Sequence, residues 1–592
     1  MSKKWIIALI VPESFLNEYP ELPKTVATLL YNRNLHTQLE IDEFLNPDYS
    51  QDIHDPFLFN DMEKAVAIIN DCIKEDKNIV VHGDYDADGV CASVIIISCL
   101  KKLGANSVSV FLPHRETDGY GLNINTVKNL KNQDTDLIIT CDCGVSNVSE
   151  ITLAKELGMQ VIITDHHSIP AQIPPADAII HPKISTEKYP DKGLCGGAVA
   201  FKLVQALLKN HQKNNDFLPD GQTHEAFEKW LLDLVAIASV GDMVPLLGET
   251  RTLTRYGLTV LNKTRNLGLK KLLFVAGLAD ENGQLKRKTI DTGTIGFQIV
   301  PRINAAGRMD HANNAFALLM ATDETEAENF AWALNQNNID RQKLNENLLN
   351  QALKQIKDTA QEKNSALFVI GDGWPTGILG LIAGRIKDVY YRPTIVMGIN
   401  HGEITASGRS INEFNIIESL QAKPEFFSKF GGHPQACGFT LKSIDLLEDF
   451  KKYLNDRAKE KTKDIELVSQ LRIDAEIDLD DINWKLFDLL QKFEPFGIDN
   501  EEPKYLARNL TIMDINPVGQ DGKHLRLMIK QNSQTIRKTI GFGLGDINRH
   551  PADWKNNLQI GDKIDMVFSI EVNEWNGNRE LQMTIEDIKK SD

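Results

Sequence analysis

Four side chains that commonly bind metal ions lie within seven residues of one another: His82, Asp84, Asp86 and Asp88. They directly follow an apolar run and precede a helical pattern. Imidazole and carboxylate ligands together suit divalent ions between hard and borderline, Mn²⁺ above all, and Mg²⁺ where carboxylates dominate. The residue types and their spacing therefore predict a site for divalent metal.

A calcium-binding loop is the main alternative for this stretch. Asp84, Asp86, Asp88 and Gly89 match the first part of such a loop, D-x-D-x-D-G. Its twelfth position would be Ile95, where a calcium loop needs a bidentate glutamate, and the preceding residues read as a strand rather than a helix. The sequence therefore disfavours calcium.

Two more clusters of this kind end apolar runs further along the chain. They are Asp142, after the run 137–140, and Asp165, His166 and His167, after the run 161–164. Ligands of parallel α/β sheets bind beyond the carboxyl ends of the strands, so these ends converge on one crevice. A single buried Asp or His is most often structural, but three clusters at equivalent strand ends favour a shared site. A fourth acidic candidate, Asp242, follows a helical stretch.

The elements that position these side chains alternate between strand and helix. Short apolar runs predict strands, and helical stretches lie between them. The predicted strands cover 78–81, 107–112, 137–140, 161–164 and 178–181. This alternation predicts an α/β fold with a doubly wound parallel sheet.

Further regions precede and follow this sheet. Residues 324–363 contain neither Gly nor Pro and carry apolar residues at helical spacing, which predicts one long helix joining two domains. A second α/β unit follows, and from about residue 470 short strands with Gly and Asn turns predict a small β-barrel. The expected domains are a lead-in region at 1–75, a catalytic domain at 76–322, the connecting helix at 323–363, the second α/β domain at 364–462 and the barrel at 468–592.

The composition is that of a multidomain globular protein with an acidic balance. The chain has 592 residues and a formal net charge of −17, so any contact with nucleic acid must come from local basic patches. Seven cysteines without a C-x2-C pair predict reduced thiols in the cytoplasm, and Cys141 and Cys143 alone fall short of a zinc site. No apolar run approaches the roughly 18 residues of a membrane span, so no membrane association is expected.

Six motifs in family order resemble those of the DHH phosphoesterase family, and within it the bacterial exonucleases specific for single-stranded DNA. They are His-Gly-Asp-Tyr-Asp-Ala-Asp-Gly (82–89), Cys-Asp-Cys-Gly (141–144), Asp-His-His (165–167), Ser-Val-Gly-Asp-Met-Val-Pro-Leu (239–246), Pro-Arg-Ile-Asn-Ala-Ala-Gly-Arg (301–308) and Gly-Gly-His-Pro-Gln-Ala-Cys-Gly (431–438). The resemblance covers nearly the whole chain. It implies a DHH catalytic domain, a DHHA1 domain at 364–462 and an OB fold that binds nucleic acid at 468–592.

The resemblance also implies two adjacent divalent ions, Mn²⁺ or Mg²⁺. One would be held by His82, Asp86 and Asp142, and the other by Asp88, Asp142, His166 and Asp242. Asp142 would bridge the pair, while Asp84, Asp165 and His167 would lie in or beside the ligand shell and orient it. The catalytic set implied in this way is Asp84, Asp86, Asp88, Asp142, His166, His167 and Asp242.

Substrate contacts follow from the same resemblance. Arg115, Ser407 and Arg409 would grip the 5′ phosphate end of a strand, and Arg302 and Arg308 would hold backbone phosphates. Arg385 and His433 are further candidates in the DHHA1 domain. The chain departs from the family pattern at Pro375, where relatives usually carry a histidine after the tryptophan.

The barrel carries a run of basic residues without an acidic one between Gly522 and Gly545. These residues are Lys523, Arg526, Lys530, Arg537 and Lys538. In an acidic chain they predict a stripe that binds a nucleic-acid strand, with Phe542 as a stacking group. A merely solvated face of the sheet is the alternative.

The implied activity is a metal-dependent 5′ to 3′ exonuclease that hydrolyses single-stranded DNA to 5′ mononucleotides in recombination and repair. Expected partners are single-stranded DNA and, by the resemblance, a single-strand-binding protein and a RecQ-type helicase; a monomer is expected. The alternatives are a DHH phosphodiesterase for short oligonucleotides or cyclic dinucleotides, and a catalytically silent replication scaffold. Small-substrate relatives generally lack the barrel, and the intact metal-binding residues argue against a silent scaffold.

Overall fold

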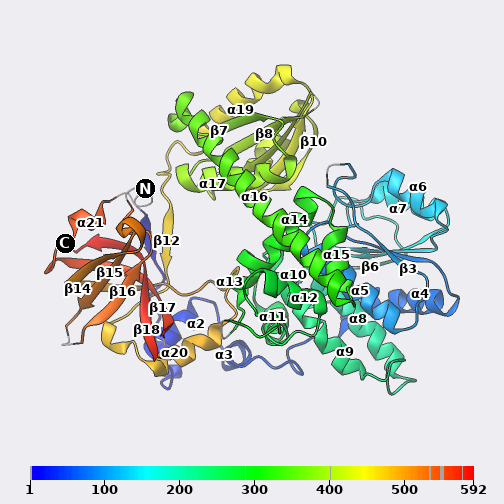
Figure 1. The fold of residues 1–592 in the computed structure, drawn as a ribbon, viewed down its shortest axis with the longest axis horizontal. Helices are drawn as coiled ribbons and strands as arrows, with labels where there is room; N and C mark the ends of the chain where they lie inside the picture. Colours follow the sequence, from blue (N-terminus) through cyan, green and yellow to red (C-terminus); the bar gives the residue numbers. More distant parts are fainter. Residues whose placement is uncertain are drawn as a thin grey trace. The chain divides into compact units, whose positions relative to one another are not determined.

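The structure is a computed structural model, and it describes residues 3–115, 117–286, 289–400, 402–532, 535–546, 552–575 and 578–591. The chain forms two compact units (Figure 1). The smaller comprises Met1–Pro47, Glu466–Phe496 and Asn500–Asp592, and the larger comprises Asp48–Ile465 and Gly497–Asp499. Among the helices of the described residues, none is long and apolar enough to cross a membrane.

A five-stranded parallel sheet organises the first part of the larger unit. Its strands are β2 (Ile79–His82), β3 (Val108–Phe111), β4 (Leu137–Cys141), β5 (Gln160–Thr164) and β6 (Ala178–Ile180), in the order β3-β2-β4-β5-β6. The predicted doubly wound sheet is thereby confirmed. The chain runs outward in opposite directions from the neighbours β2 and β4, so their carboxyl ends form the point where such folds bind ligands.

Helices cover the sheet and carry the remaining site residues. They include α4 (Met62–Lys74), α5 (Ala87–Lys102), α6 (Ile124–Asn132), α7 (Val148–Glu156), α8 (Gly196–Gln212), α10 (Leu232–Gly241) and α11 (Gly248–Leu261). Helix α5 is apolar around nearly its whole circumference and packs against α8 and α10. A helix of this kind is stable only when it is enclosed, so α5 is fixed firmly in the core.

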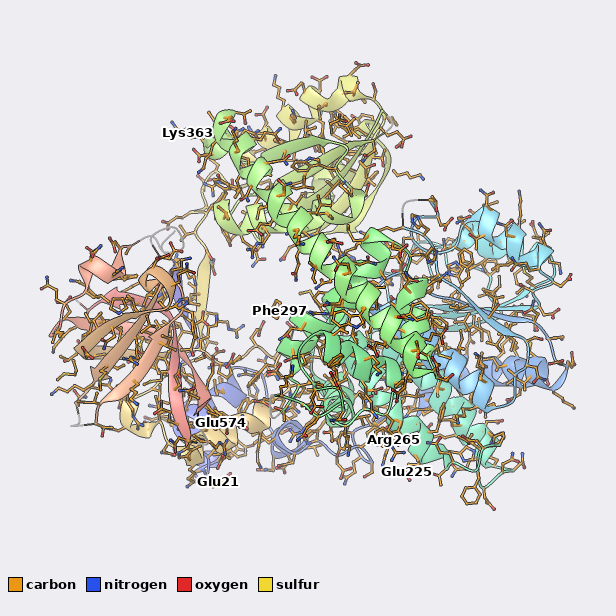
Figure 2. All side chains as sticks on the ribbon, viewed as in Figure 1. Glu21, Glu225, Arg265, Phe297, Lys363 and Glu574 are labelled. Atoms are coloured by element: carbon orange, nitrogen blue, oxygen red, sulfur yellow. The ribbon has the colours of Figure 1, made fainter. Side chains whose placement is uncertain are left out.

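Helix α16 (Glu324–Asp358) is the predicted long helix and has 35 residues. Its first half packs against α12 (Leu267–Val275), α14 (Val300–Met309) and α15 (Asn313–Met320), and its second half against α17 (Thr376–Tyr390) and β7 (Leu367–Asp372). It ends before Lys363, which is labelled in Figure 2, because Ala360 adopts a left-handed conformation with φ of 52°. The helix therefore contributes to the cores of both domains.

The second α/β domain contains a mixed sheet in the order β10-β11-β9-β8-β7. Besides β7, its strands are β8 (Thr394–Asn400), β9 (Glu403–Arg409), β10 (Phe427–His433) and β11 (Ala436–Leu441). Helices α17 and α19 (Leu447–Lys461) accompany the sheet. Strand β9 thus carries Ser407 and Arg409 on a rigid element.

The smaller unit contains a closed β-barrel. Its strands are β13 (Ala475–Glu476), β14 (Tyr505–Val518), β15 (His524–Lys530), β16 (Arg537–Gly541), β17 (Lys563–Trp575) and β18 (Asn578–Lys590). The order is β13-β14-β15-β16-β18-β17, and pairing of β14 with β17 closes the barrel. A small closed barrel of this kind matches the predicted OB-like domain.

The expected single lead-in region at 1–75 is divided between the two units. Strand β1 (Lys4–Ile7) pairs in parallel with β12 (Gln470–Ile473), so residues 1–47 belong to the barrel unit. Helix α4 belongs to the larger unit instead. Composition could not reveal this division, because the pairing joins segments more than 460 residues apart.

Candidate active site

The turn after β2 presents three carboxylates. Asp86 caps α5, where its Oδ1 accepts hydrogen bonds from the backbone N–H groups of Asp88 at 3.0 Å and Gly89 at 3.1 Å. A Cβ at Gly89 would lie 2.5 Å from the backbone nitrogen of Asp84, so only glycine allows this close approach. The α5 cap thereby fixes the turn that aims Asp84, Asp86 and Asp88.

Asp142 lies in the turn after β4 and adopts a left-handed conformation with φ of 61°. Its side chain is 2% exposed. Non-glycine residues are uncommon in this conformation, and it costs roughly 1 to 3 kcal/mol. The backbone strain at Asp142 therefore accompanies a buried carboxylate at the sheet's ligand-binding edge.

His166 directs one ring nitrogen toward three carboxylates. Its Nε2 lies 3.1 Å from Asp142 Oδ1, 3.4 Å from Asp242 Oδ2 and 3.7 Å from Asp88 Oδ2. The neighbouring His167 instead donates from Nδ1 to Asp165 Oδ1 at 2.8 Å. Residues from β2, β4, β5 and the end of α10 thus meet at one place, as the sequence predicted.

The start of α8 holds the carboxylate of Asp88. The backbone N–H groups of Gly196 and Gly197 donate to its two oxygens at 2.7 and 2.6 Å. A Cβ at Gly196 would come within 2.5 Å of the Asp142 Cβ, and one at Gly197 within 2.6 Å of the Ala238 Cβ. These glycines were not predicted, and the only signal for them was a glycine pair before a helical pattern.

The ligand atoms fall into three groups whose members lie within 4.8 Å of one another. The groups are Asp84, Asp86 and Asp142; Asp88, His166 and Asp242; and Asp142, His166 and His167. Asp142 and His166 each belong to two groups. A carboxylate has two oxygens and can bind two adjacent ions, whereas a neutral imidazole has one lone pair and binds one. The predicted ligand His82 lies outside all three groups, whereas Asp84 groups with Asp86 and Asp142.

Several buried polar atoms here make no hydrogen bond among the described residues. They are His82 Nε2, Asp84 Oδ1, Asp142 Oδ1, and both ring nitrogens of His166. Buried polar atoms without partners are costly, so they are normally satisfied by protein, water or an ion. Oxygen and imidazole atoms that converge in this way fit divalent metal ions such as Mn²⁺.

The electrostatics of the cluster also favour a cation. Burial, followed by repulsion from neighbouring carboxylates, raises the pKa of Asp84, Asp88 and Asp142 well above its ordinary value. The same causes raise the pKa of Asp242 to about 7. Each carboxylate can stay ionised at neutral pH only if positive charge joins the cluster.

The histidines divide into two electrostatic classes. Burial lowers the pKa of His82 to about 4 and that of His166 to about 3, so both rings are neutral and have a lone pair for a metal. Burial also opposes the charged form of His167, but the hydrogen bond to Asp165 and the attraction of the nearby carboxylates together outweigh it and raise the pKa of His167 to about 9. His167 is therefore a protonated donor beside the carboxylates.

A cavity of about 380 Å³ lies between the DHH-like part and the second α/β domain of the larger unit. Its lining includes Arg115, Arg308, Ser407, Arg409 and Lys429 and, among the residues that the structure describes, no carboxylate. The Arg115 guanidinium lies over the Tyr85 ring at 4.9 Å, and Arg308 Nη1 donates to the Gly377 carbonyl at 2.8 Å. Since Tyr85 stands between Asp84 and Asp86, this arginine cavity adjoins the carboxylate cluster.

Three other predicted phosphate-binding residues lie outside the cavity lining. Arg302 donates to Asn335 Oδ1 at 3.0 Å and to the Gln298 carbonyl at 2.6 Å. Its guanidinium is therefore held by hydrogen bonds to neighbouring helical residues. Arg385 and His433 are exposed and do not line the cavity. The lining residue Lys429 was not predicted, because nothing in its local sequence distinguishes it from a surface lysine.

The basic residues of the barrel do not all share one face. Arg526 and Lys530 alternate with the buried residues of β15, so they lie on the outer face of that strand. Lys538 of β16 pairs with Met528 on the same face. Arg537 pairs with the buried Ile529 and donates to the carbonyls of Leu479 at 3.3 Å and Ile482 at 2.8 Å. The predicted stripe therefore reduces to Arg526, Lys530 and Lys538 on the strands, with Lys523 in the preceding turn.

Pro375, where the family histidine is missing, precedes the first turn of α17, and the next two residues, Thr376 and Gly377, line the cavity. Phe542 is 64% exposed in the turn after β16, where its ring contacts His524 edge-on at 5.4 Å. Pro375 therefore lies beside the arginine cavity, and Phe542 is exposed on the barrel.

Comparison with known families and proteins agrees with this architecture. The DHH family N-terminal domain matches residues 78–239, the DHHA1 domain matches 362–460, and the RecJ OB domain matches 473–587. The single-stranded-DNA-specific exonuclease RecJ of Bacillus subtilis is 34% identical over 579 residues, which cover 98% of this chain and 69% of that protein. RecJ of Haemophilus influenzae is 29% identical over 541 residues, covering 90% of this chain and 91% of that protein.

A solved structure gives the same result for the fold. The crystal structure of RecJ from Thermus thermophilus in complex with Mn²⁺ superposes with a TM-score of 0.80 at 25% identity, covering all of this chain and 80% of that one. The likeness therefore extends through the carboxylate cluster, the second α/β domain and the barrel. With its DHH, DHHA1 and RecJ OB domains and its 34% identity to a RecJ protein, this chain belongs to the RecJ family.

Proposed function

We propose that this protein is a metal-dependent exonuclease that hydrolyses single-stranded DNA from the 5′ end and releases 5′ mononucleotides. The observation that carries the proposal is the convergence of acidic and imidazole ligands beside a cavity whose described lining residues are cationic or neutral. The relatives named as single-stranded-DNA-specific exonucleases support the substrate class.

Two divalent ions, Mn²⁺ or Mg²⁺, would be held by the clustered residues, with Asp142 shared between them. When bound, such ions generate a hydroxide nucleophile at neutral pH and stabilise charge on the phosphoryl and leaving oxygens. We assign His82, Asp84, Asp86, Asp88, His166 and Asp242 to the remaining ligand positions. The clustered atoms without hydrogen bonds support this assignment.

His167 supplies a second function in the proposed reaction. Its ring is protonated and held by Asp165 through a hydrogen bond of 2.8 Å. A cationic donor fixed beside the cluster would form a charge-assisted hydrogen bond with an oxygen that becomes negative during hydrolysis. Asp165 thus orients the ring and keeps the proton on it.

The arginine cavity would determine which end of the strand is cut. A terminal phosphate carries up to two negative charges, and Arg115 and Arg409 are suited to bind it through paired N–H donors. Because the cavity adjoins the carboxylates, a strand held by its 5′ phosphate would place its first phosphodiester near the metals. This arrangement supports release of single nucleotides from the 5′ end.

The barrel favours a long polymer over the small-substrate alternative. Arg526, Lys530 and Lys538 would track phosphates of a single strand, while the exposed Phe542 would stack on a base. We further propose that the protein acts as a monomer in the cytoplasm, in recombination and repair. A single-strand-binding protein and a RecQ-type helicase are the proposed protein partners.

The proposed activity can be tested by digesting single strands labelled at either end, with Mn²⁺ and with a chelator. We expect labelled mononucleotide to appear at once from 5′-labelled strands and only at the end of digestion from 3′-labelled strands. Immediate release from the 3′ end, or cleavage in the chelator, would overturn the proposal.

A further inference from the structure

Helix α14 connects the arginine cavity to the metal-binding turn. Arg308 near its end lines the cavity, and one turn earlier Asn304 Oδ1 accepts the backbone N–H of Ala87 at 2.7 Å. Ala87 lies between Asp86 and Asp88. A Cβ at Gly307 would lie 2.6 Å from the Tyr85 carbonyl oxygen, so α14 packs directly on this turn.

A second connection runs through Tyr120. Its hydroxyl donates to the backbone carbonyl of Asp142 at 3.0 Å, and its oxygen lies 3.0 Å from His167 Nδ1. The hydroxyl has one proton, which it donates to the carbonyl, while the single Nδ1–H of His167 donates to Asp165 Oδ1 at 2.8 Å. Five residues before Tyr120, Arg115 lines the cavity.

The two connections have a common design. In each, a cavity arginine and a hydrogen-bonding side chain lie close together in the chain, and the side chain holds the backbone of a turn that carries candidate ligands. Neither Asn304 nor Tyr120 belongs to the ligand groups or to the cavity lining. Their contacts suit them to transmit a change at the cavity to the turns at Ala87 and Asp142.

We propose that Asn304 and Tyr120 are positioning residues that couple a 5′ phosphate in the arginine cavity to the alignment of the metal-binding turns. The inference rests on the proposed function and adds that the phosphate accelerates the chemical step. Binding energy at a remote group raises kcat only when it is used to align the reacting centre. A 5′ phosphate therefore raises kcat as well as affinity, and loss of either connection removes the effect on kcat alone.

The experiment compares one single-stranded oligonucleotide with a 5′ phosphate or a 5′ hydroxyl, using the full chain with Mn²⁺. In the wild type we expect the phosphate to raise kcat at least about tenfold. In Asn304→Ala and in Tyr120→Phe the ratio of the two kcat values should fall to within about twofold of one, while the ratio of the KM values stays unchanged. Mn²⁺ affinity, measured by electron paramagnetic resonance, should stay within about twofold of the wild type because no proposed ligand is removed.

Two further variants separate coupling from general damage. Asn304→Asp keeps an acceptor for the Ala87 N–H and should restore most of the kcat ratio; the ratio on one enzyme cancels any effect of the added charge. Tyr391→Phe removes a tyrosine hydroxyl that contacts Glu413 in the second α/β domain, and it should keep the wild-type ratio. If Asn304→Ala does not fold, Tyr120→Phe decides the question, since it deletes a single oxygen.

The coupling is wrong if the phosphate changes only KM in the wild type. It is also wrong if the variants lose kcat equally on both substrates, or lose Mn²⁺ affinity together with activity. Wild-type cleavage of the 5′-hydroxyl strand tests the proposed function separately, so failure of the coupling and failure of that function give different results.

Discussion

Asp142 combines a left-handed backbone, a buried carboxylate and membership of two ligand groups. Its neighbours Asp84 and Asp88 are equally buried, and burial followed by mutual repulsion raises the pKa of all three. The metal-free site is therefore a local source of instability that bound cations would remove. Strain and repulsion of this kind are commonly retained where a site needs them for function.

This repulsion predicts how the stability of the metal-free protein depends on pH. The unfolded carboxylates lose their protons near pH 4, whereas folded Asp242 keeps its proton up to about pH 7. Unfolding then releases protons, so the free energy of unfolding falls as pH rises through this range. In a chelator, thermal unfolding should begin at a lower temperature at pH 7 than at pH 5, and Mn²⁺ should stabilise more at pH 7. An unfolding temperature that rises with pH and does not change with Mn²⁺ would contradict the assignment of this cluster as a metal site.

Arg409 is expected to determine the preference for strands that carry a 5′ phosphate. A hydrogen bond to a charged group is worth about 1.5 to 3 kcal/mol, or roughly 10- to 150-fold in affinity. Arg409→Ala should lower the preference for 5′-phosphate over 5′-hydroxyl ends, measured as the ratio of kcat/KM, by about that factor. Arg457→Ala, which removes a surface ion pair with Glu418, is the matched control and should keep the preference. An unchanged preference in Arg409→Ala would place the 5′ pocket elsewhere.

At the scale of elements, the first turn of α8 contacts Asp88 and Asp142, which the local sequence did not reveal. Gly196 approaches Asp142 so closely that Gly196→Ala would put a Cβ 2.5 Å from the Asp142 Cβ. We expect this variant to lose Mn²⁺ binding and hydrolysis and to unfold at a lower temperature. Calorimetric titration with Mn²⁺ and thermal melting check both effects.

Gly384→Ala is the control for this prediction. Gly384 lies within α17, and a Cβ there would meet no atom within 4 Å. Replacing a helical glycine by alanine stabilises by up to about 1 kcal/mol, so this variant should melt at or slightly above the wild-type temperature with full activity. A Gly196→Ala variant that binds Mn²⁺ as tightly as this control would show that the α8 start is not needed to position Asp88 and Asp142.

The strands and the grouping of acidic and histidine side chains at their carboxyl ends could be predicted because the relevant signals are local. An apolar run that ends in Asp or His shows both the strand and the side chain at its carboxyl end, as at β2, β4 and β5. Gly196, Asn304 and Tyr120 could not be predicted, because each acts on a segment far away in the chain. The direction of Arg537 was missed for another reason: counting charge in a run ignores the alternation of side chains along a strand.

At the scale of the whole molecule, the acidic chain must bind a polyanion through local positive patches. Each phosphate that a protein neutralises on a single strand contributes about 0.7 to the slope of log affinity against log salt. Changing Arg526, Lys530 and Lys538 together to Gln should therefore flatten this slope by roughly 2. Fluorescence anisotropy with a long single strand at several salt concentrations measures the slope.

The same triple variant distinguishes a polymer enzyme from a small-substrate one. Cleavage of a dinucleotide, which has no long tail of phosphates for the barrel to bind, should be unchanged in it. Arg537→Gln should instead lower the melting temperature, since Arg537 satisfies two backbone carbonyls. If the triple variant keeps the wild-type salt dependence, the outer face of β15 and β16 is only solvated and the barrel does not guide the strand.

The central claim is that the carboxylate cluster holds two metal ions that hydrolyse single-stranded DNA. Asp142→Asn tests it most directly, because asparagine tolerates the left-handed backbone and keeps the shape while removing the shared negative charge. Equilibrium dialysis with Mn²⁺, together with digestion of a 5′-labelled strand, should give two ions and rapid mononucleotide release for the wild type, but fewer than two ions and no release for the variant. Near wild-type hydrolysis by a folded Asp142→Asn protein would contradict the claim.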